Sequence, residues 1–516
     1  MIHAALTSTP ERLPTRYRPT DRAAGTARRG SAGAFLSIVV NRDSSTPLFL
    51  QVYHQVREGI ESGRIPVATR LPSSRQFAIE LGVSRITITI AYEQLISEGY
   101  AEGHRGSAVL ACNPAPVPRQ EQNGGAITPR IPSMVQSYGK SIVDLGFPDM
   151  RSFPYKIWSR CITRAARDDL FELLPDAPIL GDPQLRSEIA RHLLEWRGLK
   201  VTAEQVIVTA GSGDALELIL HTLTKSGDVV ALENPGYPSL RRHVERLGLK
   251  PRYMHIDRQG AELPETLHGE SPALTVLTPS HQFPLGGAMT LSRRNDFLKH
   301  AVSTSGWIVE DDYDSEFVYA GQRLPALASL PGRERVIYVG TFSKAFGSGL
   351  RLGYMVVPSQ LLERFAASIT LVGLTASAMA QRPLAMMIRD GELHRHLRTM
   401  RRLYSQRYAA FVAALRSELE GLATFTDHRA GMQLALYLPH HCCDAAVADA
   451  ADRKGIACKP LSSYYATPDA APGLLLGFCN TSPEDSAKVA RTLRELVELH
   501  SAQPAARMRS VEKEAA

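Results

Sequence analysis

The chain has 516 residues, more than one hydrophobic core usually supports, so two or three domains are expected. Hydrophobic residues make up 44% and charged residues 22%, as in an ordinary soluble globular protein. No apolar run is long enough to cross a bilayer, and the first residues lack the apolar segment of a secretory signal, so neither a membrane-spanning nor a secreted protein is expected. Six cysteines without metal-ligand spacing indicate free thiols, no metal site and a cytoplasmic location.

The charge is positive and unevenly distributed. A net charge of +7 favours an acidic partner, although a basic enzyme without such a partner explains it equally well. The first lysine is Lys140, and every earlier cation except histidine is arginine. Arginine suits phosphates and guanine edges, which favours nucleic acid; a genome-wide arginine bias is the alternative.

Residues 1–45 have little apolar periodicity and are predicted to form a disordered basic arm. A helix is predicted next, because apolar residues then recur every four positions. These residues are Leu48, Val52, Val56 and Ile60. The segment "RLPSSRQFAIEL" predicts a second helix, with Ser73 or Ser74 as its N-cap.

The segment "GVSRITITIAYEQLISEGY" is ambiguous, because its run of β-branched residues favours a strand by propensity. We predict a helix instead, since Ser84 is a good N-cap and the larger apolar residues lie near helical spacing. Those residues are Ile86, Ile90, Leu95 and Ile96. The following "YAEGHRGSAVLA" predicts a short β-hairpin.

Residues 46–112 therefore follow the winged helix-turn-helix plan, in which a helix end enters the major groove and a β-wing touches the flanking backbone. A three-helix unit that only docks to protein is the alternative. The candidate DNA contacts lie on the second helix, at the start of the third helix and in the wing. They are Arg75, Ser84, Arg85, Thr87, His104 and Arg105.

The segments "LPSSR", "GVSRITI" and "GHRGS" resemble the GntR family of winged-helix regulators over the whole of this domain. The resemblance implies DNA binding as a dimer at an operator. One departure is Ala68, where the family usually has glycine, and we expect it to affect a turn but not the groove contacts.

Residues 113–140 contain repeated prolines and a Gly-Gly pair, and are predicted to form a linker. Over residues 141–500, short apolar runs such as "QVIVTA", "DVVALE", "ALTVLTP", "GWIVEDDY" and "RVIYVGTF" alternate with amphipathic helices. This pattern predicts an α/β domain with a largely parallel sheet, followed from about Ala380 by a smaller α+β subdomain. Residues 501–516 are predicted to be a disordered tail.

Several chemically useful residues follow directly after predicted strands. Pyridoxal phosphate requires an amine, a carboxylate for the ring nitrogen, a donor near the ring oxygen and a phosphate cup. Each of these residues is a weak signal by itself, since an aspartate after a strand could also bind magnesium or cap a helix. Together they are more specific, because α/β sheets bind ligands at the carboxyl ends of their strands. The candidates are Lys344, Asp311, Tyr313, Ser212, Gly213, Thr341, Ser343 and Arg351.

Residues 145–495 resemble the fold-type I, aspartate-aminotransferase-like proteins, which depend on pyridoxal 5'-phosphate. By that resemblance, Lys344 bonds to the cofactor aldehyde, Asp311 pairs with the ring nitrogen and Tyr313 faces the ring oxygen. The implied phosphate ligands are Ser212, Gly213, Thr341, Ser343 and Arg351. Tyr237 in "ENPGYPS" is a candidate to lie beside the ring; a turn tyrosine that only packs is the alternative.

The two modules in this order resemble the MocR-type subfamily of GntR regulators, as do the segments "PSHQFPLGG" and "EDDYDSEF". The resemblance implies a transcriptional regulator that forms head-to-tail homodimers. It also implies that the cofactor belongs to a sensor of a small molecule, either an amine or amino compound or pyridoxal phosphate itself.

Four departures bear on catalysis. Leu475 stands where aminotransferases commonly have a carboxylate-binding arginine, and Asp214 stands where the MocR pattern has glutamine. The usual Asn-Pro element is replaced by "SHQFPLGG", so His281 and Gln282 become candidate cofactor contacts. The segment "LPDAPILGD" lacks a tyrosine that often reaches the phosphate of a partner subunit. We therefore predict little or no transaminase turnover.

Two alternatives remain open at this stage. One is an active aminotransferase with an appended DNA-binding domain. The other is a GntR-type regulator whose effector domain has lost the cofactor.

Overall fold

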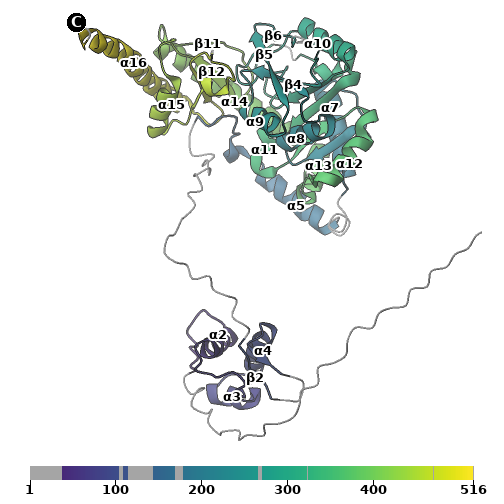
Figure 1. The fold of residues 1–516 in the computed structure, drawn as a ribbon, viewed down its shortest axis with the longest axis vertical. Helices are drawn as coiled ribbons and strands as arrows, with labels where there is room; N and C mark the ends of the chain where they lie inside the picture. Colours follow the sequence, from purple (N-terminus) through teal and green to yellow (C-terminus); the bar gives the residue numbers. More distant parts are fainter. Residues whose placement is uncertain are drawn as a thin grey trace, which may run out of the picture. The chain divides into compact units, whose positions relative to one another are not determined.

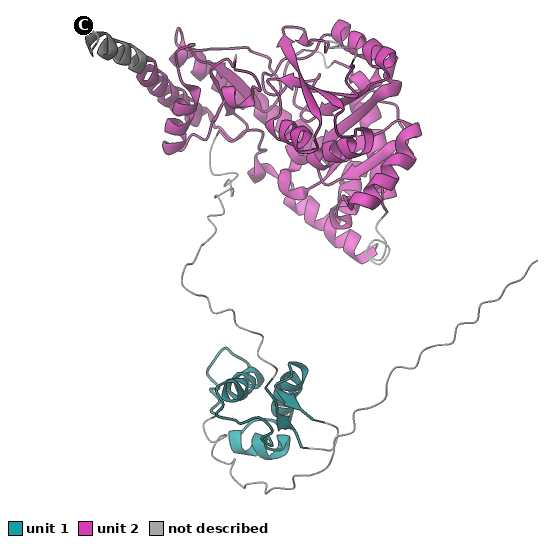
Figure 2. Cartoon of the chain, in the orientation of Figure 1, with its two compact units in different colours: residues 1–131 teal, residues 132–516 magenta. Residues whose placement is uncertain are grey.

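The computed structural model describes residues 38–103, 108–113, 143–168, 178–264, 270–321, 324–468 and 470–514. The chain divides into two compact units, residues 1–131 and residues 132–516 (Figure 2). The division falls within the predicted linker, most of which lies outside the described residues. Each unit has its own buried core, which agrees with the multidomain organisation predicted from length and composition.

The described part of the N-terminal unit contains three helices and a short antiparallel hairpin (Figure 1). Their bounds are α2 Leu48–Glu61, α3 Ser74–Leu81, α4 Arg85–Ser97, β1 Ala101–Glu102 and β2 Leu110–Ala111. This order confirms the predicted winged helix-turn-helix plan. Ser73 is the N-cap of α3, since its side chain accepts a hydrogen bond from the backbone N–H of Gln76.

The boundary predicted for the disordered arm at residue 45 is wrong. Ile38 is buried in the core of the N-terminal unit. The side chain of Gln55 on α2 accepts a hydrogen bond from the backbone N–H of Val39 and donates one to its carbonyl oxygen, at 3.0 and 2.7 Å. Apolar burial and these two hydrogen bonds therefore fix a segment that has no periodicity of its own.

Helix α4 begins after Ser84 as predicted, but of the four apolar residues that supported the prediction only Leu95 is buried. The buried face carries Ile88 and Leu95. Ile86 is 71% exposed and Ile90 is 40% exposed. Residues spaced by three or four positions share a helix face, so the set containing Ile88 faces the core and the set containing Ile86 faces away from it.

The larger unit is built on an eight-stranded sheet in the order β3-β10-β9-β8-β7-β4-β5-β6. The strands are β3 Val206–Thr209, β4 Val229–Asn234, β5 Lys250–Asp257, β6 Gly260–Ala261, β7 Leu274–Leu277, β8 Trp307–Asp312, β9 Val336–Thr341 and β10 Gly353–Val356. The pairs linking β5, β4, β7, β8 and β9 are parallel, while β10 runs antiparallel to both neighbours. The predicted largely parallel sheet is confirmed, including all five strands named from sequence.

Helices cover both faces of this sheet. They are α5 Tyr155–Asp168, α7 Pro183–Arg197, α8 Ser212–Leu223, α9 Pro238–Arg246, α10 Leu291–Thr304, α11 Ser343–Phe346, α12 Leu362–Val372 and α13 Gln381–Arg389. One core cluster joins α8, α9 and α12 to the sheet, and a second joins α5, α7, α10 and α13 to its other face (Figure 1). Burial on both faces explains why the strands are continuous apolar runs.

The smaller subdomain is an antiparallel sheet in the order β11-β12-β14-β13 with three helices. Its elements are α14 Glu392–Leu419, β11 Thr424–Phe425, β12 Gln433–Tyr437, α15 Asp444–Arg453, β13 Lys459–Pro460, β14 Gly473–Gly477 and α16 Pro483–Glu514. This confirms the predicted α+β subdomain.

Helix α16 has its last assigned residue at Glu514 and so overlaps the tail predicted over residues 501–516, which stays a prediction. The segment is rich in alanine, arginine and glutamate, which extend a helix that has already formed. No helix within the described residues is long and apolar enough to cross a membrane.

Candidate cofactor site

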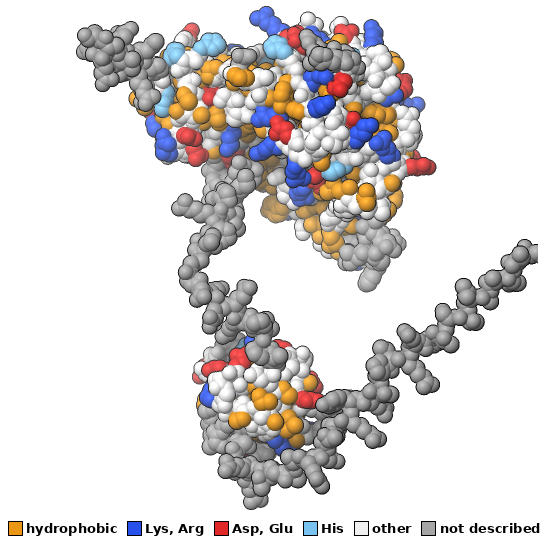
Figure 3. Space-filling model, in the orientation of Figure 1, with side chains coloured by type: hydrophobic (Ala, Val, Ile, Leu, Met, Phe, Trp, Pro, Cys, Tyr) orange, Lys and Arg blue, Asp and Glu red, His pale blue; other side chains and the backbone are white. Residues whose placement is uncertain are grey.

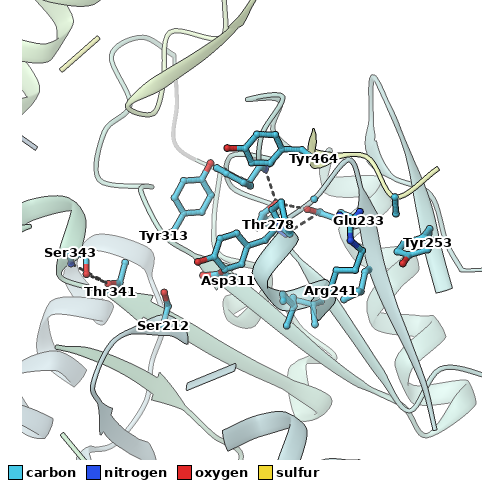
Figure 4. A pocket seen from close by; sticks show the side chains of 18 of the residues that line it. Ser212, Glu233, Arg241, Tyr253, Thr278, Asp311, Tyr313, Thr341, Ser343 and Tyr464 are labelled. Carbon is cyan, nitrogen blue, oxygen red and sulfur yellow. Dashed lines mark hydrogen bonds between the residues drawn. The ribbon is translucent and has the colours of Figure 1, made fainter. Parts of the chain in front are cut away.

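The predicted cofactor residues converge because their strands are neighbours in one sheet. Asp311 lies near the end of β8, Thr341 ends β9, and Ser212 begins the helix that follows β3. With Lys344 they line one cavity of about 240 Å³ at the carboxyl ends of the strands. Figure 4 shows Ser212, Thr341 and Ser343 grouped on one side of Asp311.

Lys344 lies on α11, directly after β9, and is half-buried. Its Nζ donates a hydrogen bond to the carbonyl oxygen of Gly146 at 3.2 Å. Burial lowers the pKa of the Lys344 amine, which favours the neutral, nucleophilic form. Gly146 has a φ of +60°, and a Cβ there would lie 2.5 Å from Nζ, so only glycine allows this approach.

Asp311 provides a buried carboxyl group with an unused oxygen. Burial is the main reason that its pKa rises to about 7, and the neighbouring Asp312 adds to the effect. Its Oδ1 has no hydrogen-bond partner among the described residues. A buried acceptor of this kind is suited to a cationic N–H group entering the cavity, such as a protonated ring nitrogen.

Tyr313 lines the cavity and is held from behind by His281. The Tyr313 hydroxyl lies 3.0 Å from His281 Nδ1, and the same nitrogen lies 3.0 Å from Asp314 Oδ2. His281 and Asp314 are both buried, and neither lines the cavity. His281 therefore supports Tyr313, while Gln282 donates to Glu233 and to the backbone instead of facing the cavity.

The small hydroxyl groups form one end of the cavity. Thr341 Oγ1 accepts a hydrogen bond from the backbone N–H of Ser343 at 3.1 Å, and Ser212 is the first residue of α8. Hydroxyls at a helix start provide the donors that a phosphate requires. Gly213 and Arg351 are close in sequence to this end but do not line the cavity.

Arg351 is paired with the unexpected carboxylate at Asp214. Its Nη2 donates to Asp214 Oδ1 at 3.1 Å, and the arginine side chain is 64% exposed. The sequence raised the concern that Asp214 would repel a phosphate. The ion pair neutralises the carboxylate but occupies part of the guanidinium that would hold the phosphate.

The opposite wall is aromatic. Tyr237 is the N-cap of α9, lines the cavity and is 49% exposed. The rings of Tyr237 and Phe283 pack edge to face with their centroids 5.9 Å apart. Tyr464 from the smaller subdomain packs edge to face on the Phe283 ring, with a centroid distance of 5.4 Å. The wall at the "SHQFPLGG" segment is thus formed by Phe283, with His281 and Gln282 behind it.

Sequence reasoning missed several cavity residues. Glu233 near the end of β4 accepts hydrogen bonds from the backbone N–H and hydroxyl of Thr278, and burial raises its pKa to about 7. Glu233 and Thr278 both lie at the carboxyl ends of strands, so the strand-end rule that identified Asp311 would also have identified them. Figure 4 places Glu233, Arg241 and Tyr253 together on the other side of Asp311 from the hydroxyl groups.

The candidate DNA contacts gather at the start of α4. Ser84 Oγ accepts a hydrogen bond from the Thr87 backbone N–H at 3.1 Å, and Arg85 Nε donates to Ser74 Oγ at 3.4 Å. Arg75 and Arg85 line the same surface groove between α3 and α4. Predicted wing contacts His104 and Arg105 lie outside the described residues.

Comparison with known proteins decides the family. Residues 48–110 match the bacterial regulatory proteins of the gntR family, and residues 158–493 match the class I and II aminotransferases. The probable rhizopine catabolism regulatory protein MocR of Rhizobium meliloti is 34% identical over 469 residues, covering 89% of this chain and 95% of that protein. This chain belongs to the MocR-type subfamily of GntR transcriptional regulators.

A second MocR-type relative is similar over much of the chain. The pyridoxine biosynthesis transcriptional regulator PdxR of Corynebacterium glutamicum is 34% identical over 381 residues, covering 72% of this chain and 80% of that protein. These relatives carry the names of transcriptional regulators, so the regulator interpretation is confirmed.

Two solved structures similar to this MocR-type regulator are aminotransferases. The kynurenine aminotransferase of Pyrococcus horikoshii superposes with a TM-score of 0.65 at 24% identity, over 70% of this chain and 92% of that one. LysN, the α-aminoadipate aminotransferase of Thermus thermophilus, superposes with a TM-score of 0.63 at 26% identity, over 69% of this chain and 92% of that one. They confirm the fold-type I architecture of the larger unit.

In this MocR-type regulator, the position expected for a carboxylate-binding arginine is apolar. Leu475 on β14 is fully buried and packs with Ala435 and Leu461. Among the described residues that line the cavity, the cations are Lys344 and Arg241, and Arg241 already donates to the carbonyl oxygen of Tyr465 at 2.9 Å. The cavity therefore lacks the standard handle for an α-amino acid.

Proposed function

We propose that this regulator binds pyridoxal 5'-phosphate through Lys344 and uses it to sense a small molecule that controls operator binding. The observation that carries the proposal is a pair of groups that line one cavity: the Lys344 amine, whose pKa is lowered, and the Asp311 carboxyl group, which has an unused oxygen. When bound, the cofactor supplies an aldehyde that reacts reversibly with primary amines.

The chain's own residues fit the remaining parts of the cofactor. Asp311 is placed to pair with the ring nitrogen, and Tyr313, supported by His281, is placed to donate to the ring oxygen. Tyr237 lies on the wall where it can cover the ring. The proposed phosphate ligands are Ser212, Thr341 and Ser343, which line the cavity, together with Gly213 and Arg351, which do not line it.

The proposed effector is an amine or amino compound, or pyridoxal phosphate itself. Either ligand can control the protein only if it binds one arrangement of the chain more tightly than another. The apolar surroundings of Leu475 argue that turnover of common amino acids is little or none, since no arginine there fixes their carboxylate.

Cofactor binding is tested by loading the full-length protein with pyridoxal phosphate and recording its absorbance. We expect a band near the violet end of the visible range that is lost in Lys344→Ala and kept in Lys299→Ala, which changes an exposed lysine on α10. Absence of the band from loaded wild-type protein would contradict the proposal. Release of keto acid from several amino donors would instead favour an active aminotransferase.

We propose that the head of the regulator contacts its operator through α3, the start of α4 and the wing. The residues are Arg75, Ser84, Arg85, Thr87, His104 and Arg105. Arg85→Ala should abolish a sequence-specific gel shift with the promoter beside its own gene. The control Arg64→Ala changes an exposed arginine that pairs with Glu58, and should keep the shift.

A head-to-tail homodimer is the assembly we propose. Support comes from large apolar side chains exposed on the larger unit, among them Tyr155 at 64%, Leu194 at 52% and Leu371 at 88%. Because contiguous exposed apolar surface is typical of protein interfaces, these side chains are candidates for the dimer contact. Sedimentation should give twice the chain mass of 56.5 kDa, and a monomer at micromolar concentration would refute the assembly.

A further inference from the structure

Near its start, helix α4 exposes two isoleucines that do not pack in the core of the N-terminal unit. Ile86 is 71% exposed and Ile90, one turn later, is 40% exposed. The core of the unit is filled from the other side of the same helix, by Ile88 and Leu95. Several hydrophobic side chains are also visible on this unit in Figure 3. Exposed isoleucines cost solubility, so a pair on one helix face calls for a partner.

The hydroxyl groups around these isoleucines are already hydrogen-bonded within the helix. Ser84 Oγ accepts from the Thr87 backbone N–H at 3.1 Å and lies 2.8 Å from Thr87 Oγ1. Thr89 Oγ1 donates to the carbonyl oxygen of Arg85 at 3.0 Å. Thr89 lies between the isoleucines on the same face, three residues after Ile86, so the first turns of this face are apolar. The exposed Glu93, three residues after Ile90, marks the end of the apolar part.

The charges beside this apolar face favour DNA as its partner. Arg85 begins α4, and Arg75 lines the adjoining groove. The first turn of α4, which the structure describes in full, contains no acidic residue. Cations next to the positive end of a helix attract a polyanion and disfavour a second copy of the same basic surface.

The major groove offers one apolar group to such a face, the C5-methyl group of thymine. We propose that Ile86 and Ile90 read thymine methyl groups in the operator, with Arg85 fixing the helix end beside them. This inference rests on operator binding by the winged helix, and it adds a chemical class of base contact at two named residues. It predicts thymine at defined positions of each half-site.

Deoxyuridine tests the contact directly, because it pairs like thymine but lacks the methyl group. Duplexes are first selected from a random-sequence library with the full-length protein, and each thymine of a selected duplex is then replaced in turn. We expect at least one replacement per half-site to lower affinity about fourfold, the effect of burying one methyl group.

A double-mutant cycle assigns the contact to a residue. The substitution Ile86→Ala should lower the affinity for the thymine duplex by a similar factor. The variant should then bind the sensitive deoxyuridine duplex as tightly as it binds the thymine duplex, because the methyl contact is already lost. The control Ile96→Ala removes an isoleucine that is 37% exposed near the other end of α4, about 15 Å along the helix. It should keep full sensitivity to the methyl group.

The outcomes separate this inference from the regulator assignment. A protein that selects no duplex contradicts both. A selected duplex that is insensitive to every deoxyuridine, or additive effects of Ile86→Ala and deoxyuridine, contradicts the inference alone. If Ile86→Ala instead changes only the sedimentation of the protein, the face binds a second copy and the inference is wrong. The deoxyuridine scan uses wild-type protein, so it decides the question even if a variant folds poorly.

Discussion

Replacing Ala68 by glycine should stabilise the N-terminal unit. Ala68 has a φ of +65°, in the left-handed region that costs a residue with a Cβ about 1–2 kcal/mol. Glycine removes this cost but gives the unfolded chain extra freedom, worth about 0.4–1 kcal/mol. The expected net gain for Ala68→Gly is about 0.5–1 kcal/mol in the free energy of unfolding.

The strained conformation is held by pairing with the wing. The Ala68 backbone N–H donates to the carbonyl oxygen of Ala111 at 2.7 Å, and the Ala111 N–H donates to that of Thr69 at 2.8 Å. Glycine keeps both hydrogen bonds and leaves α4 untouched. Operator affinity should therefore change by less than about twofold, within the error expected for an independent site.

Two probes separate the units during thermal unfolding. All three tryptophans, Trp158, Trp196 and Trp307, belong to the larger unit, so their fluorescence reports only that unit. Circular dichroism reports both units. The transition seen by circular dichroism but not by fluorescence should rise by about 2–8 °C in Ala68→Gly, given the size of the domain.

Gly82→Ala is the matched control with the opposite sign. Gly82 ends α3 with a φ of +64°, and the nearest atom to an added Cβ is Arg42 Nη2 at 3.7 Å, so the substitution adds left-handed strain without a clash. It should lower the same transition by a similar amount. If Gly82→Ala lowers the transition while Ala68→Gly leaves it unchanged, the strain assigned to Ala68 is refuted.

Three further predictions concern the cofactor site. Asp214→Asn should raise affinity for pyridoxal phosphate about fivefold in an absorbance titration, because Arg351 is released from an ion pair worth about 1 kcal/mol; unchanged affinity would contradict this. His281→Asn should move the pH midpoint of the loaded protein's visible band while keeping the cofactor bound, because Tyr313 loses its partner; an unmoved midpoint would assign His281 a purely structural role. Burial raises the pKa of Asp311 from its ordinary value of 3.8 to about 7 in the folded, cofactor-free protein. The folded state therefore binds a proton more tightly than the unfolded state does, which stabilises the larger unit fully below about pH 4 and no longer once the pH has risen through 7. The urea midpoint by tryptophan fluorescence should fall over that range, with a shallower fall in Asp311→Asn.

The parts of the site that follow strands could be predicted from sequence. Asp311, Thr341 and Lys344 each lie at or just after the end of a buried apolar run, and the rule that parallel strands end at one edge brings them together. Their neighbours in the chain determine where they lie. Local reasoning is sufficient for such residues.

The rest depends on packing between distant segments. Tyr464 reaches the aromatic wall from a subdomain more than a hundred residues after the strand that carries Asp311, and no pattern around Tyr464 marks it. The sequence does not show that Ile86 points away from the core, because five consecutive β-branched residues satisfy several helical spacings at once. Only the fit of Ile88 into the three-helix core decides which face is buried.

A sensor and an aminotransferase place different demands on the binding site around the same lysine. An enzyme gains by binding the transition state more tightly than the substrate, for which a fixed carboxylate clamp is useful. Leu475 removes that clamp by filling its place with apolar contacts. A sensor gains by exchanging its ligand near the concentration to be measured, for which weaker binding is useful. Asp214 would weaken the hold of Arg351 on a bound phosphate by pairing with its guanidinium. Both departures therefore act in the direction of exchange and against turnover, which is the balance expected if Lys344 serves recognition.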